Sequence, residues 1–447
     1  MTIDILSTRF EPRLDDKRLR ELITVRGKPL EGLASINEQV AAQQLAEALK
    51  TVFIPNTFTL DLIIEMLGKA RQFSVDSFST ERDYVSKLYQ PPEREVMPIC
   101  LTGLAGVGKS ATIAALRKVL PGPQTLRIKH YEGVRQVVSH WYASARGKGL
   151  IRQLLSGLVG IEYKGNVAAL LIESRRRAYA DGITLVLLEE MQHINTGQGA
   201  ARVTDILLTM SAIGPPMMYA ANYSLVHRLM KRNSEDTHRL LSEPRVMLPD
   251  APDCEAWHEY VRECMVVSNE LIQIKSSILA EQLYRFTFGI KRLVIHLLKL
   301  AYLEGRQRGR YTIELQDLDH AFRSTGYSLY KAEVGELQRQ ALQRSNSGIR
   351  MDLKCPFDIP LRSSIVEFPR REREQRVTTK VFLSSLNAEE RAGLEQIKPE
   401  LLDQTPAKRK SKTSIRKATE EEMLDAHQRF LAGVLDPSSS PTRRLDD

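Results

Sequence analysis

The sequence predicts an α/β fold in which a phosphate-binding loop joins a buried parallel strand to a helix. The loop is Gly103–Ser110, with the sequence GLAGVGKS, a complete G-x-x-x-x-G-K-[ST] motif. The apolar run 99–102 before it is typical of a buried strand, and Ile113, Leu116 and Leu120 after it recur at helical spacing. A glycine-rich turn with an incidental lysine is the alternative. The match of every motif position within a strand, loop and helix favours a nucleotide site.

Each residue type in this loop suits the binding of a polyphosphate. The three glycines allow the backbone to turn its N–H groups inward around phosphates, and the N-terminus of the following helix adds a partial positive charge. Lys109 is predicted to reach the β- and γ-phosphates, and Ser110 to hold Mg²⁺. The predicted cofactor-binding residues of the loop are Gly103, Gly106, Gly108, Lys109, Ser110 and Ala111.

Length and composition set broad limits on the protein. The 447 residues are enough for two or three domains, and 42% hydrophobic with 27% charged residues is typical of globular proteins. The four cysteines are far apart and form no C-x-x-C pair, which argues against a zinc cluster or a disulfide framework. Residues 1–10 contain no apolar leader and no apolar run is long enough to span a membrane, so we expect a cytoplasmic protein without a membrane partner. The net charge of +9 favours a polyanionic partner.

A second strand is predicted to end in two catalytic carboxylates. The most apolar run of the chain, 183–188, is followed by Glu189 and Glu190, the arrangement called Walker B. The first acid of this arrangement binds Mg²⁺ and the second polarises the attacking water. A solvated turn is the weaker alternative. The first acid is normally Asp, and the longer Glu189 can shift the metal, so we include slow hydrolysis among the expectations.

Three further positions are predicted to act on the triphosphate. Asn222 ends the apolar strand 217–221, where it can reach the γ-phosphate or orient water; a plain turn residue is the alternative. Arg239 precedes the last predicted strand, where an arginine can stabilise the charge on ATP in a neighbouring subunit. Arg232 is the second choice for this position, and either arginine could instead be a surface cation.

The chain after residue 252 is predicted to be helical up to residue 323 and to form a lid. Gly289 precedes a helix with an apolar face, and Lys291 or Arg292 at its start can point at the nucleotide. Residues 408–417 then contain six cations within ten positions, and the end of the chain has a low apolar content. Such tails are usually disordered until they bind a partner, which can be nucleic acid or protein.

Basic residues are interleaved with aromatic residues from 129 to 152. This pattern suits a surface that follows a nucleic-acid backbone, but a solvated helix face with its aromatic residues in the core explains it equally well. The basic members of this run are Lys129, Arg135, Arg146, Lys148 and Arg152, and the aromatic members are Tyr131, Trp141 and Tyr142.

Taken in order along the chain, these motifs resemble the AAA+ ATPases, and within them the transposition regulators TnsC and TniB. The resemblance covers roughly residues 50–325. The loop, the Walker B strand, Asn222, Arg239 and the segment 289–292 carry the general resemblance. The run Glu189–Ile194, EEMQHI, directs it towards TnsC and TniB, because the second acid in those families is commonly followed by an aromatic residue or Met, then Gln and His.

The resemblance implies a fold and a function. The fold is an AAA+ core with a five-stranded parallel sheet, a small helical lid, and irregular N- and C-terminal extensions. We expect an N-terminal extension at 1–50, the nucleotide-binding core at 51–250, the lid at 251–330 and a partly disordered tail at 331–447. The function is ATP hydrolysis coupled to assembly of a hexameric or heptameric ring, or a helical filament, on double-stranded DNA. Such proteins link a target selector to a transposase, which often contacts the tail.

The same resemblance assigns roles to individual residues. The catalytic set is Lys109, Glu190, Asn222 and Arg239; the metal set is Ser110 and Glu189, and Arg292 binds the nucleotide from the lid. Basic loops that face the interior of the ring contact DNA in these families, and the candidates here are Lys129, Arg135, Arg146 and Lys148.

Other functions are less well supported by the sequence. An AAA+/STAND-like NTPase of a signalling or defence module that does not bind DNA is the main alternative. A GTPase is disfavoured because no N-K-x-D guanine-reading motif is present. A nucleotide-binding scaffold without turnover is a third alternative, for which the test is whether Glu189→Asp raises the hydrolysis rate.

Overall fold

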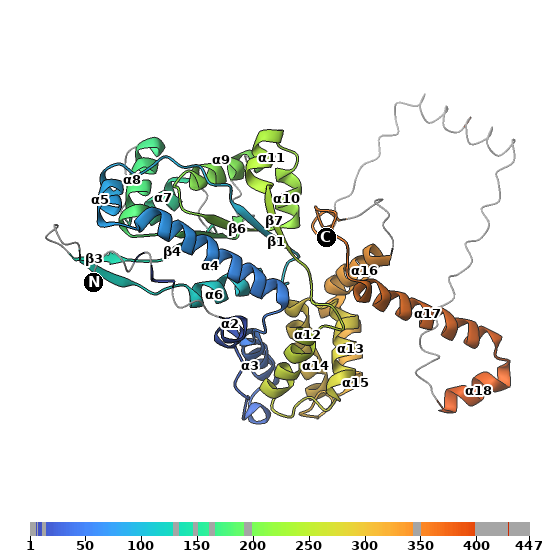
Figure 1. Cartoon of the computed structure of the whole chain (residues 1–447). Helices are drawn as coiled ribbons and strands as arrows, with labels where there is room; N and C mark the ends of the chain where they lie inside the picture. Colours follow the sequence, from blue (N-terminus) through green and yellow to red (C-terminus); the bar gives the residue numbers. More distant parts are fainter. Residues whose placement is uncertain are drawn as a thin grey trace, which may run out of the picture. The chain divides into compact units, whose positions relative to one another are not determined.

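The computed structural model describes residue 6 and the ranges 8–10, 15–127, 134–145, 151–160, 166–191, 199–342 and 350–397, together with residue 428. The chain divides into two compact units, residues 1–371 and 372–447. The first unit contains the sheet, the phosphate-binding loop and the helical region after the sheet (Figure 1). No helix among the described residues is both long and apolar enough to cross a membrane.

The first unit is built on a five-stranded parallel sheet with the strand order β4-β5-β6-β1-β7. The central strands are fully buried apolar runs, as expected for a parallel sheet that is covered on both faces. The strands are β1 (Ile99–Gly103), β4 (His140–Ser144), β5 (Leu185–Glu189), β6 (Met217–Asn222) and β7 (Glu243–Met247). The predicted fold class is therefore confirmed: the chain has an α/β fold with a five-stranded parallel sheet and an added helical region.

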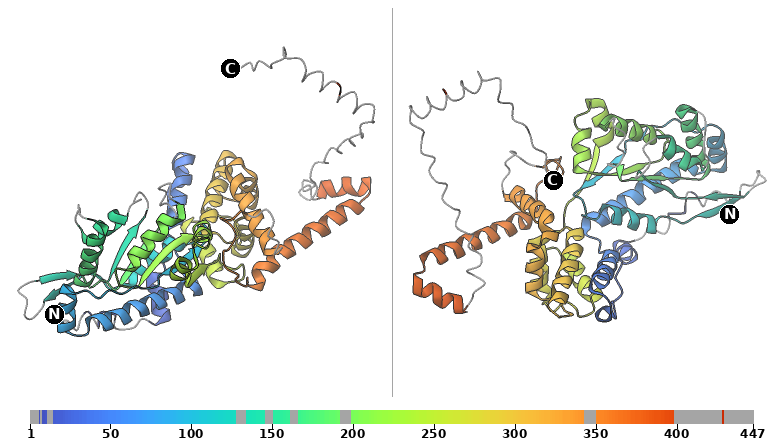
Figure 2. Two further views of the ribbon diagram at one scale, coloured as in Figure 1. Left: turned by 90° about the horizontal axis from the view of Figure 1, so that it is seen from above. Right: turned by 180° about the vertical axis from the view of Figure 1, so that it is seen from behind.

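Helices cover both faces of this sheet. Side chains alternate between the two faces along each strand, and the apolar side chains on each face are buried beneath helices. Ile99 and Leu101 point into one core and Cys100 into the other, and the β5 side chains alternate in the same way. The views in Figures 1 and 2 show helices on both sides of the sheet. The first core includes α4 (Thr57–Phe78) and α6 (Lys109–Val119). The second core includes α7 (Ile151–Val159), α8 (Val167–Ala180), α9 (Gly199–Ser211), α10 (Tyr223–Leu229) and α11 (Ser234–Leu241).

The helical region after the sheet packs with a helix from the N-terminal segment. In sequence order it comprises α12 (Glu255–Val267), α13 (Ser276–Thr287), α14 (Lys291–Gln307) and α15 (Leu315–Arg323), followed by the 3₁₀ turn Thr325–Tyr327 and by α16 (Ser328–Leu342). The N-terminal segment contains α2 (Asp16–Ile23), the 3₁₀ turn Leu33–Ser35 and α3 (Glu38–Thr51). Helix α3 lies along α14, and its buried residues belong to the same core cluster. The segment before residue 50 therefore contributes to the packing of the lid helices.

The segment after α6 also has strand character, with Leu126 and Ile128 apolar between polar neighbours, but it does not belong to the main sheet. It forms β2 (Gln124–Arg127), which pairs antiparallel with β3 (Val134–Val137). This small sheet contributes Leu126 and Val137 to a separate aromatic cluster that also includes α5 (Glu81–Tyr89). The fifth strand of the main sheet is β4, which lies in the run that the sequence pattern left open between a nucleic-acid surface and a solvated helix face.

The boundary between the two units falls within α17 (Ser363–Ser385), and α18 (Ala388–Ile397) follows it in the sequence. Helix α17 begins in the first unit, and α18 lies in the second. The basic run 408–417 lies outside the described residues.

Candidate phosphate-binding site

The phosphate-binding loop lies at the carboxyl end of the interior strand β1, between β1 and α6. Gly106 has φ 82° and Gly108 has φ 122°, backbone conformations that side chains rarely tolerate. A Cβ at Gly103 would lie 2.5 Å from the carbonyl oxygen of Met247 on the neighbouring strand. Glycine is therefore required at these three positions by backbone conformation or by close packing.

The first backbone N–H groups of α6 have no acceptor within the helix, as at the start of any α-helix. The N-cap residue of α6 is Gly108, which has no side chain to accept a hydrogen bond from the first amides of the helix. These amides and the helix dipole favour an anion at this end of the 11-residue helix.

Lys109 is held inside the loop by two main-chain acceptors. Its Nζ donates hydrogen bonds to the carbonyl oxygens of Gly103, at 2.7 Å, and of Leu104, at 2.8 Å. Burial, with a smaller contribution from the positive charge of Arg292, lowers the pKa of Lys109 to about 8. An anion placed between Lys109 and Arg292 would offset both the burial of the Lys109 charge and the repulsion between the two cations.

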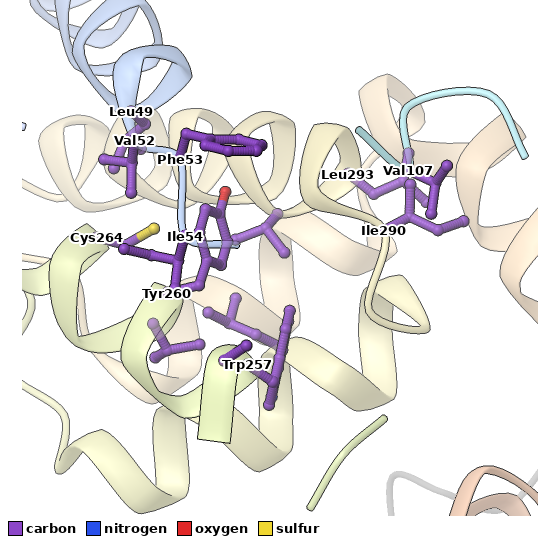
Figure 3. Close-up of a cluster of buried hydrophobic side chains, with 14 of the residues drawn as sticks. Leu49, Val52, Phe53, Ile54, Val107, Trp257, Tyr260, Cys264, Ile290 and Leu293 are labelled. Carbon is purple, nitrogen blue, oxygen red and sulfur yellow. The ribbon is translucent and has the colours of Figure 1, made fainter. Parts of the chain in front are cut away.

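Arg292 contacts the loop directly from the start of the lid helix α14. Its backbone N–H donates to the carbonyl oxygen of Gly106 at 3.3 Å, and a Cβ at Gly106 would lie 2.6 Å from the Cβ of Arg292. In Figure 3, Val107 of the loop lies against Ile290 and Leu293 at the start of the same helix. The loop and the lid helix therefore pack as neighbours.

The neighbouring cation Lys291 has a different environment. Its Nζ lies 3.2 Å from the buried carboxylate of Asp250 and 3.3 Å from the carbonyl oxygen of Ile54. Of the two cations that the sequence left open, Arg292 is the one beside the phosphate loop, whereas Lys291 joins the lid to the chain before α4.

Glu189 ends β5 close to the loop. The residue is 7% exposed. Oε2 accepts a hydrogen bond from the hydroxyl of Tyr142 at 2.7 Å, whereas Oε1 is buried and accepts none from the described part of the chain. Burial raises the pKa of Glu189, and hydrogen bonding from Tyr142 and the proximity of Ser110 oppose that rise. A buried carboxylate oxygen without a donor, beside a serine hydroxyl, fits a site for a hard cation such as Mg²⁺.

Glu190 lies on a backbone turn directly after the strand. Its φ of 54° is in the left-handed region, which is unfavourable for a residue with a side chain. Its Oε2 accepts a hydrogen bond from the hydroxyl of Ser144 at 3.1 Å. The turn separates the two adjacent carboxylates, so that each one meets a different hydroxyl of β4.

Asn222 lies at the same edge of the sheet as the loop. In the strand register it is directly opposite Gly103, the first residue of the loop. Its Oδ1 caps α10 by accepting from the backbone N–H of Leu225 at 2.9 Å and from the hydroxyl of Ser224 at 3.0 Å. Its predicted role near the γ-phosphate stays a prediction.

Both candidate arginines for a neighbouring subunit lie on or next to α11 and are paired within the chain. Arg239 forms ion pairs with Glu95 at 2.9 Å and Glu235 at 3.0 Å, and its side chain is 43% exposed. Arg232 forms one with Asp236 at 3.2 Å. The accessible guanidinium of Arg239 keeps it the first choice.

The structure describes one of the four predicted DNA contacts. Lys129, Arg146 and Lys148 lie outside the described residues. Arg135, on β3, is half-buried; its Nη1 has no exposed surface and its charge acts on the buried Tyr84 and on Asp181. This position is poorly suited to a phosphate contact.

Two residues of β4 contact the acids without a clear signal in the sequence. The sequence pattern places Tyr142 among the aromatic residues of a possible nucleic-acid surface, but its hydroxyl donates to Glu189. The pattern does not distinguish Ser144, whose hydroxyl donates to Glu190. The run His140–Ser144 has a mixed polar and apolar pattern, which predicts a strand only weakly.

Comparison with known proteins found distant structural similarity only. No family model matches the chain, and no curated protein matches it. Among solved structures, the Aeropyrum pernix ORC2 protein in its ADP form is 13% identical with a TM-score of 0.38, over 62% of this chain and 75% of that chain. The Aeropyrum pernix ORC1 protein in complex with DNA is 14% identical with a TM-score of 0.34, over 71% and 81%.

A third similar structure is the Thermotoga maritima RuvB Holliday junction branch migration motor. It is 10% identical with a TM-score of 0.33, over 69% of this chain and 87% of that chain. The fold class is evident from this chain itself: a phosphate loop follows β1, an interior strand of the five-stranded parallel sheet, and a helical region contacts that loop. This architecture is consistent with an AAA+ core.

Proposed function

We propose that the chain is an ATPase that binds ATP with Mg²⁺ at the loop Gly103–Ser110. The observation that carries the proposal is the convergence of Lys109 and Arg292 on one loop whose backbone requires glycine. In this proposal Lys109 and the loop amides bind the phosphates, Ser110 and Glu189 hold the metal, and Arg292 reports the bound nucleotide to the lid. The metal supplies charge neutralisation between the phosphates when it is bound.

Three residues are proposed to complete hydrolysis. Glu190 orients and polarises the attacking water, and Asn222 contacts the γ-phosphate or that water. Arg239 of one subunit stabilises charge on the ATP of the next subunit, with Arg232 as the second choice. An ATP that contacts an arginine of the neighbour only in the assembled state favours assembly, so ATP would act as a switch.

We further propose that the assembled protein binds double-stranded DNA and regulates DNA transposition. The net charge of +9 and the resemblance of the Glu189–Ile194 run to TnsC and TniB support this step. Lys129, Arg146 and Lys148 are the preferred DNA contacts. The tail 331–447 is proposed to contact a transposase, with a target selector as a further partner.

The test is binding of a fluorescent duplex by the full chain, followed by anisotropy. We expect tight binding with a slowly hydrolysed ATP analogue and Mg²⁺, weaker binding with ADP, and loss of ATP-dependent binding and assembly in Lys109→Ala. Electron microscopy of the same samples should show rings or filaments on the duplex. A chain that binds ATP, stays monomeric and ignores the duplex would contradict the DNA proposal and favour the signalling NTPase.

A salt titration tests the proposed DNA contacts separately. The logarithm of the binding constant should fall with the logarithm of salt concentration, with a slope of about 0.9 per phosphate contacted. The triple variant Lys129→Ala, Arg146→Ala, Lys148→Ala should therefore bind more weakly and show a shallower slope. An unchanged slope would remove these three residues from the interface.

A further inference from the structure

The feature that the proposed mechanism has not used is the contact between Tyr142 and Glu189. The first acid after a Walker B strand is normally Asp, whose carboxylate ends one methylene closer to the backbone. In this chain the acid is Glu189, and its Oε2 accepts a hydrogen bond from the Tyr142 hydroxyl at 2.7 Å. The chain therefore combines a longer acid at position 189 with a tyrosine hydroxyl that donates to it.

Tyr142 is held in position by neighbours other than Glu189. In the sheet register it pairs with Leu187, two residues before Glu189 on the adjacent parallel strand. The guanidinium of Arg117, on α6, lies 4.0 Å from the centre of its ring. Nε of Arg117 in turn donates to Nε2 of His140 at 3.5 Å. The phenol is therefore fixed between a strand and the helix that follows the phosphate loop.

The hydroxyl of Tyr142 is the donor in this bond, because an ionised carboxylate has no proton and only accepts hydrogen bonds. This bond occupies Oε2 and leaves Oε1 as the buried oxygen without a donor in the described chain.

We propose that Tyr142 is a positioning residue that holds Glu189 in the orientation in which Oε1 serves the metal, and that Glu replaces Asp at 189 because its carboxylate must reach both partners. This inference rests on the proposed Mg²⁺–nucleotide site and assigns a residue to its support. Without the hydroxyl, Glu189 would lose the donor on Oε2 and could rotate away from the metal. Residues that orient metal ligands typically contribute a factor of about ten or more to metal affinity.

The first test measures metal affinity directly. Mn²⁺ binding to the full chain with adenosine 5′-(β,γ-imido)triphosphate is followed by electron paramagnetic resonance. Tyr142→Phe should weaken Mn²⁺ binding about tenfold, while affinity for the nucleotide in EDTA stays unchanged. Tyr84→Phe is the matched control, because its hydroxyl is bonded to the carbonyl oxygen of Ala180 in a different cluster; its Mn²⁺ affinity should equal that of the wild type.

The second test uses the length of residue 189. Asp at this position cannot hold Tyr142 and a metal together, so Tyr142→Phe should change Mn²⁺ affinity less than about twofold in a Glu189→Asp background. This non-additivity would identify the two residues as one unit. An equal tenfold loss in both backgrounds would overturn the role assigned to Tyr142.

The outcomes separate this inference from the proposed function. If the wild type binds no nucleotide with or without metal, the proposed ATPase fails and the inference fails with it. If the wild type binds the Mn²⁺–nucleotide complex and Tyr142→Phe binds it equally well, Tyr142 has no positioning role and the proposed ATPase stands. A purely structural role for Tyr142 would lower thermal stability in EDTA without changing metal affinity.

Discussion

At the scale of single residues, Lys109 is the residue of the loop whose charge is disfavoured by its surroundings. It is half-buried, its ammonium group donates to two carbonyl oxygens, and Arg292 is close enough to disfavour its charge. The lowered pKa of about 8 follows from these surroundings. A triphosphate would favour the charged form and raise that pKa again.

Because the pKa of Lys109 should be higher in the nucleotide complex than in the free protein, nucleotide binding should depend on pH. Below pH 8 the free protein already carries the proton on Lys109, so affinity should be constant. Above about pH 8 binding must take up a proton, and the affinity for an ATP analogue should fall by up to tenfold per pH unit. Calorimetry in buffers of different ionisation enthalpy should show uptake of about one proton at pH 9 and almost none at pH 6.5. A constant affinity from pH 7 to 9.5 would show that Lys109 does not bind the phosphates.

Glu190 provides the second prediction for a single residue. Glu190→Gln keeps an oxygen that can accept from Ser144, so the turn and the ATP site should persist. Loss of the carboxylate should lower the hydrolysis rate by a factor of about 10² to 10⁴, with little change in ATP affinity, and should prolong the lifetime of complexes with DNA. Single-turnover hydrolysis and dissociation of labelled duplex measure the two effects. Normal turnover would exclude Glu190 from catalysis.

At the scale of elements, the contact between the phosphate loop and α14 connects the nucleotide to the lid. The contact consists of the backbone bond from Arg292 to Gly106 and the packing of Val107 with Ile290 and Leu293 (Figure 3). It leaves no space for a side chain at Gly106, whose φ is also positive. Movement of the loop should therefore be transmitted to the helix.

Gly106→Ala should separate these two elements. The new Cβ would lie 2.6 Å from the Cβ of Arg292, and the left-handed backbone adds a strain of about 1 to 2 kcal/mol. Relief of that strain by a shift of the loop should cost about tenfold in nucleotide affinity. The measurement is calorimetric titration with the ATP analogue.

Gly68→Ala is the control for that substitution. Gly68 lies within α4, and a Cβ there would meet nothing within 4 Å. Because alanine is favoured over glycine in a helix, this variant should be more stable by about 0.5 to 1 kcal/mol, with unchanged nucleotide affinity. Equal nucleotide affinities in the two variants would contradict the coupling of loop and lid.

For the whole molecule, the decisive question is whether an arginine of one subunit completes the site of another. Arg239 is exposed and its ion pairs with Glu95 and Glu235 lie at the surface, where such pairs contribute little to stability. Breaking these two ion pairs so that Arg239 can contact a triphosphate should therefore cost little free energy.

Mixing two inactive variants tests this arrangement. Arg239→Ala keeps an intact water-polarising carboxylate, and Glu190→Gln keeps an intact arginine. In a random 1:1 mixture about one quarter of the interfaces combine the intact parts of both, so ATPase activity should partly return. Each variant alone should remain inactive. A mixture without activity would exclude Arg239 from action between subunits, and the same experiment with Arg232→Ala would then test the second choice.

The sequence alone determined the parts of this protein that depend on local pattern. A glycine-rich loop, continuous apolar strands and two carboxylates after a strand are readable because backbone conformation and burial limit which residues can occupy adjacent positions. The phosphate loop, the order of the α and β elements around it and the lid helix beginning near Lys291 follow from such limits.

Only the tertiary structure shows that β4 is the edge strand that pairs with β5. Strand β4 is half-buried and carries a mixed pattern, so its five residues indicate neither a strand nor its neighbour. Pairing between strands that are 40 residues apart depends on the packing of the whole sheet. That pairing brings Tyr142 to Glu189 and Ser144 to Glu190, and it leaves Arg135 on a separate, smaller sheet.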